Sequence, residues 1–218
     1  MRPLVLIVLV IFYPWNGSAQ TETTKVETVK WLREKLAAQA TAHDKKGNRL
    51  NSTKMCVNVN LLPDEATANN AAIIKSFKDR IVSKVSWGQD EMNVQNDIFI
   101  HGKLRETYTY QVPLTAIVGA SITNCIRNAS GNVDAYADRP VFIRVKKNTT
   151  KITHQAFDQN GKATIGNAGR SYMNSLDTDW DSIIPIAGKW DSNPDLQDKV
   201  VKAFTHLAEL NDKKYTLK

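Results

Sequence analysis

The sequence predicts an α+β fold in which an antiparallel β-barrel or strongly bent sheet is packed by an N-terminal helix and a C-terminal capping helix. Apolar residues recur at helical spacing near the two ends of the exported chain. Between them, apolar and polar residues alternate with a period of two in short segments separated by turn residues. Strands and helices do not alternate along the chain, which disfavours a parallel doubly wound sheet.

Residues 1–19 have the features of a secretory signal peptide. Arg2 is the only charged residue, and the run 4–12 is wholly apolar. Pro14 then breaks the helix, and small residues lead to Ala19. A membrane-spanning helix needs about 20 apolar residues, roughly twice the length of this run. We therefore expect cleavage after Ala19, a periplasmic or secreted protein, and no transmembrane segment after processing.

The charge of the chain is modest and evenly distributed. The 218 residues carry a formal net charge of +7, without a long basic run. Nucleic-acid-binding proteins gather their basic residues on one face, so nucleic acid is not an expected partner. A protein partner or an anionic component of the cell envelope agrees better with export.

Two chemical features depend on the compartment. Cys56 and Cys125 are the two cysteines, and an even count in an oxidising compartment indicates a disulfide, with buried thiols as the alternative. Sequons for N-glycosylation begin at Asn51, Asn128 and Asn148, and they matter only in a eukaryotic secretory pathway.

The segment 20–53 is predicted to be an N-terminal helix followed by a polar linker. Thr24 and Glu27 have the spacing of a capping box, in which each side chain bonds the backbone of the other residue. The helix is expected to end near His43. One apolar stripe follows the cap at three- and four-residue spacing: Val26, Val29, Leu32, Leu36 and Ala40.

Residues 54–218 are predicted to form an antiparallel β domain. The stretch 73–87 fits both a helix and a strand, and we interpret its second part as a strand. Residues 88–96 are predicted to be a loop. Period-two alternation in the first half of this domain predicts strands at 54–61, 80–87, 98–100 and 104–112.

The second half of the domain is predicted to end in a helix at 194–211. Pro194 and Asp195 favour a helix start, and the apolar stripe that follows must dock on an apolar surface. Asn160-Gly161 predicts a hairpin turn, because both residues tolerate positive φ. Strands are predicted at 121–127, 141–145, 152–157, 162–165 and 182–186.

Asp177, Asp179 and Asp181 are the candidate metal ligands. Ca²⁺ is bound by several oxygen ligands, and carboxylates at alternate positions of a loop provide that kind of ligand. The pattern departs from an EF-hand, because Ser182 stands where glycine is required and Gly188 where glutamate is required. An exposed acidic loop is the alternative interpretation, and the same carboxylates are the candidate acids of a hydrolase.

The sequence predicts no catalytic and no cofactor-binding residue. The histidines at 43, 101, 154 and 206 do not have metal-ligand spacing, and no G-x-S-x-G elbow occurs. The segment 161–166 has the glycines of a phosphate loop but lacks its Lys-Ser/Thr. Tyr108 and Tyr110 share one strand face, which indicates core packing rather than ligand stacking.

The order of elements resembles that of pleckstrin-homology-like barrel proteins, of the uncharacterised exported bacterial kind. The resemblance rests on a strand that leads into a Pro-Leu-x-x-Ile corner at 108–117, on the helix at 199–210 and on the N-terminal helix at 27–36. It implies a small bent barrel closed by the C-terminal helix. Lipid-binding members have basic residues in the first hairpin loop, whereas residues 64–72 are acidic, so no phosphoinositide site is implied.

Together these observations favour an exported, non-catalytic binding or scaffold module of the cell envelope. Two alternatives remain open: a hydrolase acting on envelope polymers, and a lipocalin-like carrier of an apolar ligand. A carrier requires an open apolar cavity, whereas a hydrolase requires acidic groups that converge in a cleft.

Overall fold

The computed structural model describes residues 24–59, 78–123, 125–127, 133–164 and 180–216. The expected signal peptide lies outside them. The described elements, in chain order, are α1 (Lys25–Thr41), β1 (Ser52–Val59), β2 (Asp79–Trp87), β3 (Glu91–Ile100), β4 (Lys103–Pro113), η3 (Leu114–Ala116), β5 (Ile117–Ile122), β6 (Cys125–Arg127), β7 (Val133–Tyr136), β8 (Val141–Lys146), β9 (Lys151–Ala156), β10 (Trp180–Ile186), η4 (Trp190–Ser192) and α3 (Pro194–Thr216).

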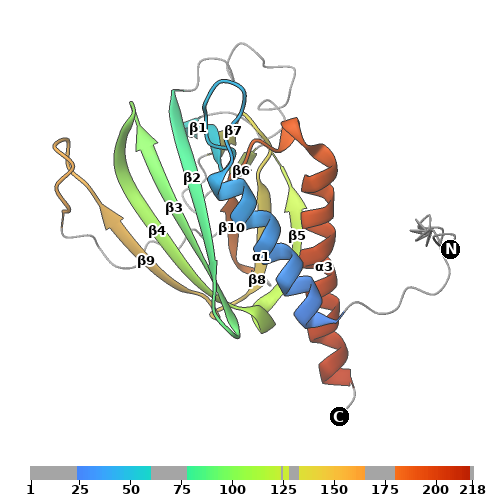
Figure 1. Ribbon diagram of the computed structural model, residues 1–218. Coiled ribbons are helices and arrows are strands. Elements are labelled where there is room, and N and C mark those ends of the chain that lie inside the picture. The colour runs from blue at the N-terminus through green and yellow to red at the C-terminus, as the bar shows by residue number, and fades with distance from the viewer. Residues whose placement is uncertain (1–23, 60–77, 124, 128–132, 165–179, 217–218) are drawn as a thin grey trace, which may run out of the picture.

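The fold is α+β and is dominated by one strongly curled antiparallel sheet (Figure 1). Its seven strands follow the order β6-β7-β1-β2-β3-β4-β9. Strands β3 and β4 are joined by a two-residue turn in which His101 and Gly102 have φ angles of 50° and 77°. Two positive φ angles match the twist of the flanking strands, so this turn continues the curl of the sheet.

A second sheet of three strands, β10-β8-β5, packs inside the curl of the first. Its central strand β8 is buried on both faces, because α3 covers one face and the seven-stranded sheet covers the other. Phe142 meets Tyr136 of β7 edge to face, with ring centroids 5.7 Å apart. The strand predicted at 141–145 is confirmed, and its first three residues, Val141, Phe142 and Ile143, are an apolar run, as is usual where a strand is buried on both faces.

Both helices lie on the side of the small sheet, and β3, β4 and β9 extend away from them (Figure 1). Helix α3 packs against β5 and β8, and α1 packs against β2 and α3. The predicted stripe of α3 is confirmed, since Val200, Phe204 and Leu207 are fully buried. In the described part of the chain, no helix has the length and hydropathy required to cross a membrane.

The N-terminal helix confirms the predicted cap and corrects part of the predicted stripe. The Thr24 hydroxyl accepts from the N–H of Glu27 at 3.3 Å, and the Thr24 N–H donates to the Glu27 carboxylate at 2.8 Å. Leu32 and Leu36 are buried, whereas Val26 is 76% exposed. Val26 lies in the first turn, beyond the part of the helix that contacts the sheet.

Two predicted segment boundaries were wrong. Residues 88–96 are not a loop, because β3 begins at Glu91 and pairs with both β2 and β4. The strand predicted at 121–127 is two strands in different sheets: β5 ends at Ile122 and β6 begins at Cys125. The hairpin predicted around Asn160-Gly161 is present: Phe157 and Ala163 form an isolated bridge, and the Asp158 N–H donates to the Lys162 carbonyl at 2.9 Å. Residues 162–164 are not a strand, which corrects the described part of the strand predicted at 162–165.

Candidate functional site

The predicted calcium ligands are largely outside the described residues. Asp177 and Asp179 belong to the segment 165–179, and Asp181 is described only as a backbone position in β10. Among the residues that the structure describes, no group of three or more His, Cys, Asp or Glu side chains could hold a metal ion. The calcium site and the hydrolase acids stay predictions.

The structure does not bring the two cysteines together. Cys56 of β1 and Cys125 of β6 both lie opposite Ala135 of β7, which separates their strands. Two strand spacings place their Cα atoms about 9–10 Å apart, whereas a disulfide spans roughly 4.4–6.8 Å. A Cys56–Cys125 bond would therefore require a different pairing of these three strands.

Sequence reasoning missed a cluster of ionisable side chains on the inner face of the large sheet. The ring of His154 on β9 stacks on Tyr108 of β4, with centroids 4.4 Å apart. Its Nε2 lies 3.4 Å from Glu106 Oε2, and the same oxygen accepts the Tyr108 hydroxyl at 2.6 Å. The side chain of His154 is 8% exposed, and among the described residues neither ring nitrogen has a hydrogen-bond partner of good geometry.

The cavity that borders Tyr108 of this cluster is small. An apolar cavity between the two sheets has room for about one water molecule. An imidazole beside a carboxylate can transfer protons, but neither His154 nor Glu106 lines this cavity, and its small volume gives no support to an apolar carrier. The cavity is lined by Met55, Ile81, Asn96, Ile98, Tyr108, Tyr110, Ile126, Tyr136, Ile183 and Pro185.

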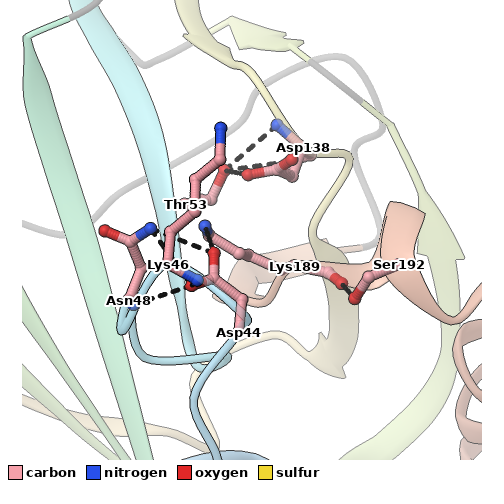
Figure 2. Close-up of polar contacts among 7 residues, drawn as sticks. All are labelled: Asp44, Lys46, Asn48, Thr53, Asp138, Lys189 and Ser192. Carbon is pink, nitrogen blue, oxygen red and sulfur yellow. Dashed lines mark hydrogen bonds and ion pairs between the residues drawn. The ribbon is translucent and has the colours of Figure 1, made fainter.

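A second polar cluster connects the segment after α1 to the segment before α3 (Figure 2). The carboxylate of Asp44 forms an ion pair with Lys189 and accepts the backbone N–H groups of Lys46 and Asn48 at 2.9 and 2.8 Å. The hydrogen bonds from Lys189 and Asn48 hold the pKa of Asp44 well below its usual value. One carboxylate therefore bonds groups from both segments, and this cluster ties the two ends of the fold together.

The neighbouring pair, Thr53 and Asp138, is a local tie of the same kind (Figure 2). The Thr53 hydroxyl lies 3.1 Å from Asp138 Oδ2 and accepts the Asp138 backbone N–H at 3.1 Å. Thr53 is 1% exposed. These contacts fix the crossing from β7 toward β8 against β1.

A buried hydrogen-bond network joins the two sheets. The Ser83 hydroxyl donates to Asn96 Oδ1 at 2.6 Å and accepts the N–H of Ala187 at 2.7 Å. Asn96 Nδ2 donates to the carbonyl of Pro185 at 3.0 Å. Ser83 and Asn96 lie on β2 and β3, and their partners Pro185 and Ala187 lie at the end of β10. The network therefore fixes the position of the small sheet relative to the large one.

The outer face of the large sheet, opposite the core, carries an extended set of polar side chains, of which the row with Val82 and Asp97 is the most buried. Cross-strand pairing aligns its residues in rows over β2, β3, β4 and β9. Apart from Val82, every side chain in three successive rows is polar. These rows are Val82, Asp97, Thr107 and Gln155; then Lys84, Gln95, Thr109 and Thr153; then Ser86, Asn93, Gln111 and Lys151.

Asp97 orders the centre of this outer face. Its carboxylate accepts from Lys84 Nζ at 2.8 Å, Gln95 Nε2 at 2.8 Å and Thr107 Oγ1 at 2.9 Å. Burial raises the pKa of Asp97, but these three hydrogen bonds outweigh burial, and the pKa lies below its usual value. The ionised Asp97 therefore holds three surface side chains in fixed positions around neutral pH.

The sequons differ in accessibility. Asn51 is 4% exposed, and its Nδ2 donates to the carbonyl of Ser83 at 2.6 Å. Asn148 is exposed in the turn between β8 and β9 and has a φ of 59°. Asn128 lies outside the described residues.

Comparison with known proteins does not place the chain in a family. No protein-family model, no curated protein and no solved structure matches it.

Proposed function

We propose that the chain is an exported binding or scaffold module of the cell envelope, and that the outer face of the seven-stranded sheet is its binding surface. One observation supports this assignment above the others. The ionisable clusters among the described residues are engaged with one another, whereas the rows of the outer face present amides, hydroxyls and lysines. Of the four strands that carry these rows, α1 packs mainly against β2, and β3, β4 and β9 extend away from both helices (Figure 1).

The chemistry of the outer face favours a hydrophilic partner. Amide side chains such as Gln95 and Gln111 both donate and accept hydrogen bonds, and threonine hydroxyls do the same. Lys84 on β2 and Lys151 on β9 add positive charge on the two flanking strands of these rows. Because Asp97 already orders its neighbours, binding costs less side-chain entropy than it would on an unordered surface.

The proposal is tested with the mature chain, residues 20–218, and an arginine placed in the middle row. Thr109 is half-buried between Gln95 and Thr153 on the outer face. The longer side chain of Thr109→Arg should cover the neighbouring polar side chains without reaching the core. The immobilised chain is incubated with a solubilised cell-envelope fraction, and the retained material is quantified and identified. The matched control is Lys202→Ala on the exposed side of α3.

We expect the Lys202→Ala variant to retain the same envelope component as the unmodified chain, and Thr109→Arg to lose it. Thermal unfolding of the three proteins shows whether the arginine has disturbed the fold. Equal retention by the unmodified chain and Thr109→Arg would exclude the outer face as the binding surface. Failure of the unmodified chain to retain any component would contradict the binding function itself.

A further inference from the structure

A hollow lies at one end of the outer face, between two turns. One wall is the start of β4, directly after the turn from β3, and the other is the hairpin that follows β9. The lining residues are Lys103, Leu104, Phe157, Gln159, Asn160 and Gly161. The hollow is open to solvent, unlike the small cavity between the two sheets.

The hairpin wall is held rigid by its own hydrogen bonds. Asp158 Oδ1 accepts the backbone N–H groups of Asn160 and Lys162 at 2.8 and 2.9 Å. The Gly161 N–H donates to the Asp158 carbonyl at 3.1 Å, and Gly161 has a φ of 78°, which favours glycine. Lys103 Nζ reaches across the hollow to the Gln159 carbonyl at 3.2 Å and connects the two walls. The hollow is therefore formed before any ligand arrives.

Its chemistry combines an apolar floor with polar edges. Phe157 and Leu104 are half-buried and supply apolar surface, whereas Lys103, Gln159 and Asn160 are exposed. A pyranose ring has a C–H face that packs on an aromatic ring and an edge of hydroxyls that bond to amide and ammonium groups. Binding sites for small molecules share this arrangement of apolar walls with a few placed polar groups.

The hollow continues into the outer face and is not a separate site. Leu104 lies opposite Phe99 of β3, and Phe99 lies opposite Arg80 of β2. The Arg80 guanidinium stacks over the Phe99 ring at 4.6 Å from its centroid. A ligand of several sugar units can therefore extend from the hollow past the Arg80–Phe99 pair toward the polar rows.

We propose that this hollow is a saccharide subsite, and that the ligand of the outer face is a glycan chain. Phe157 stacks on one sugar ring, the Asn160 amide bonds its hydroxyls, and the next units extend past the Arg80–Phe99 pair. This inference rests on the proposed binding function of the outer face.

The test uses the mature chain in affinity gel electrophoresis with four polysaccharides: xylan, laminarin, dextran and polygalacturonate. Asn160→Ala removes the exposed amide and leaves the turn, because only the backbone N–H of Asn160 bonds to Asp158. Phe157→Leu keeps apolar packing and removes the aromatic face. Lys202→Ala is the control, and Thr109→Arg reports on the rest of the outer face.

At least one polysaccharide should retard the unmodified chain and the Lys202→Ala control. A lost hydrogen bond or stacking contact should weaken the affinity of Asn160→Ala and Phe157→Leu about three- to tenfold. Retardation by none of the four polymers, or equal affinity of the two hollow variants and the control, would overturn the inference. If Thr109→Arg alone loses binding, the outer face remains the binding surface and only the subsite is refuted.

Discussion

Removal of the Ser83 hydroxyl should test the hydrogen bonds between the two sheets most clearly, because a single oxygen bonds groups of both. Ser83→Ala leaves two buried groups without a partner, the N–H of Ala187 and Oδ1 of Asn96. Each unsatisfied buried group costs about 1–3 kcal/mol. Because the change removes little volume at a site that is 2% exposed, we expect a loss of about 2–4 kcal/mol in the free energy of unfolding.

The measurement is urea unfolding of residues 20–218 followed by tryptophan fluorescence. Ser86→Ala on the same strand is the matched control, because Ser86 is exposed and its loss should change stability by less than about 0.5 kcal/mol. A loss below about 1 kcal/mol for Ser83→Ala, or equal losses for both variants, would show that this network does not join the sheets as described.

Three further predictions concern a titrating group, the core and the surface. The pKa of Asp44 is lower in the folded chain than its ordinary value of 3.8. Its carboxylate therefore stabilises the fold above that pH, and the contribution is lost as the pH falls below about 4 toward the folded pKa. In melting curves over a pH series, Asp44→Asn should lower the melting temperature at pH 7, and its deficit should shrink below pH 4; a constant deficit would contradict the Lys189 contact as its cause. Phe204→Ala removes a fully buried ring between α3 and the small sheet, so urea unfolding should show a loss of about 3–5 kcal/mol, and a loss under about 1 kcal/mol would refute this packing. When the chain is secreted from a eukaryotic host, peptide mass spectrometry should find glycan on Asn148 and none on Asn51, and a glycan on Asn51 in folded protein would contradict its burial.

The helices could be predicted because their signals are local. The capping box at Thr24 and the stripe that includes Phe204 depend on residues within a few positions of each other, and the sequence contains those positions. Strand β3 was missed because its outer side chains, such as Asn93 and Gln95, are as polar as those of a loop. Its inner residues Met92 and Val94 show the period of two, but the segment is too polar overall for that alternation to stand out.

The proposed binding surface could not be predicted, because it depends on which strands pair and in what register. Gln95, Thr109 and Thr153 form one row only through the pairing of β3, β4 and β9, and the same pairing makes Glu106 and His154 neighbours on the inner face. The same applies to Cys56 and Cys125, whose separation is set by the strand between them. The hollow is an intermediate case: the turn at Gly161 was predicted from its residues, but its position beside Lys103 was not.

The central claim is that the outer face of the large sheet binds an envelope component. Lysine acetylation followed by mass spectrometry tests it directly, with and without the component retained in the capture experiment. We expect slower acetylation of Lys84 and Lys151 on the outer face when the component is present, and unchanged acetylation of Lys199 and Lys202 on α3. Protection of the α3 lysines with unchanged labelling of Lys84 and Lys151 would place binding on the helical side and contradict binding by the outer face.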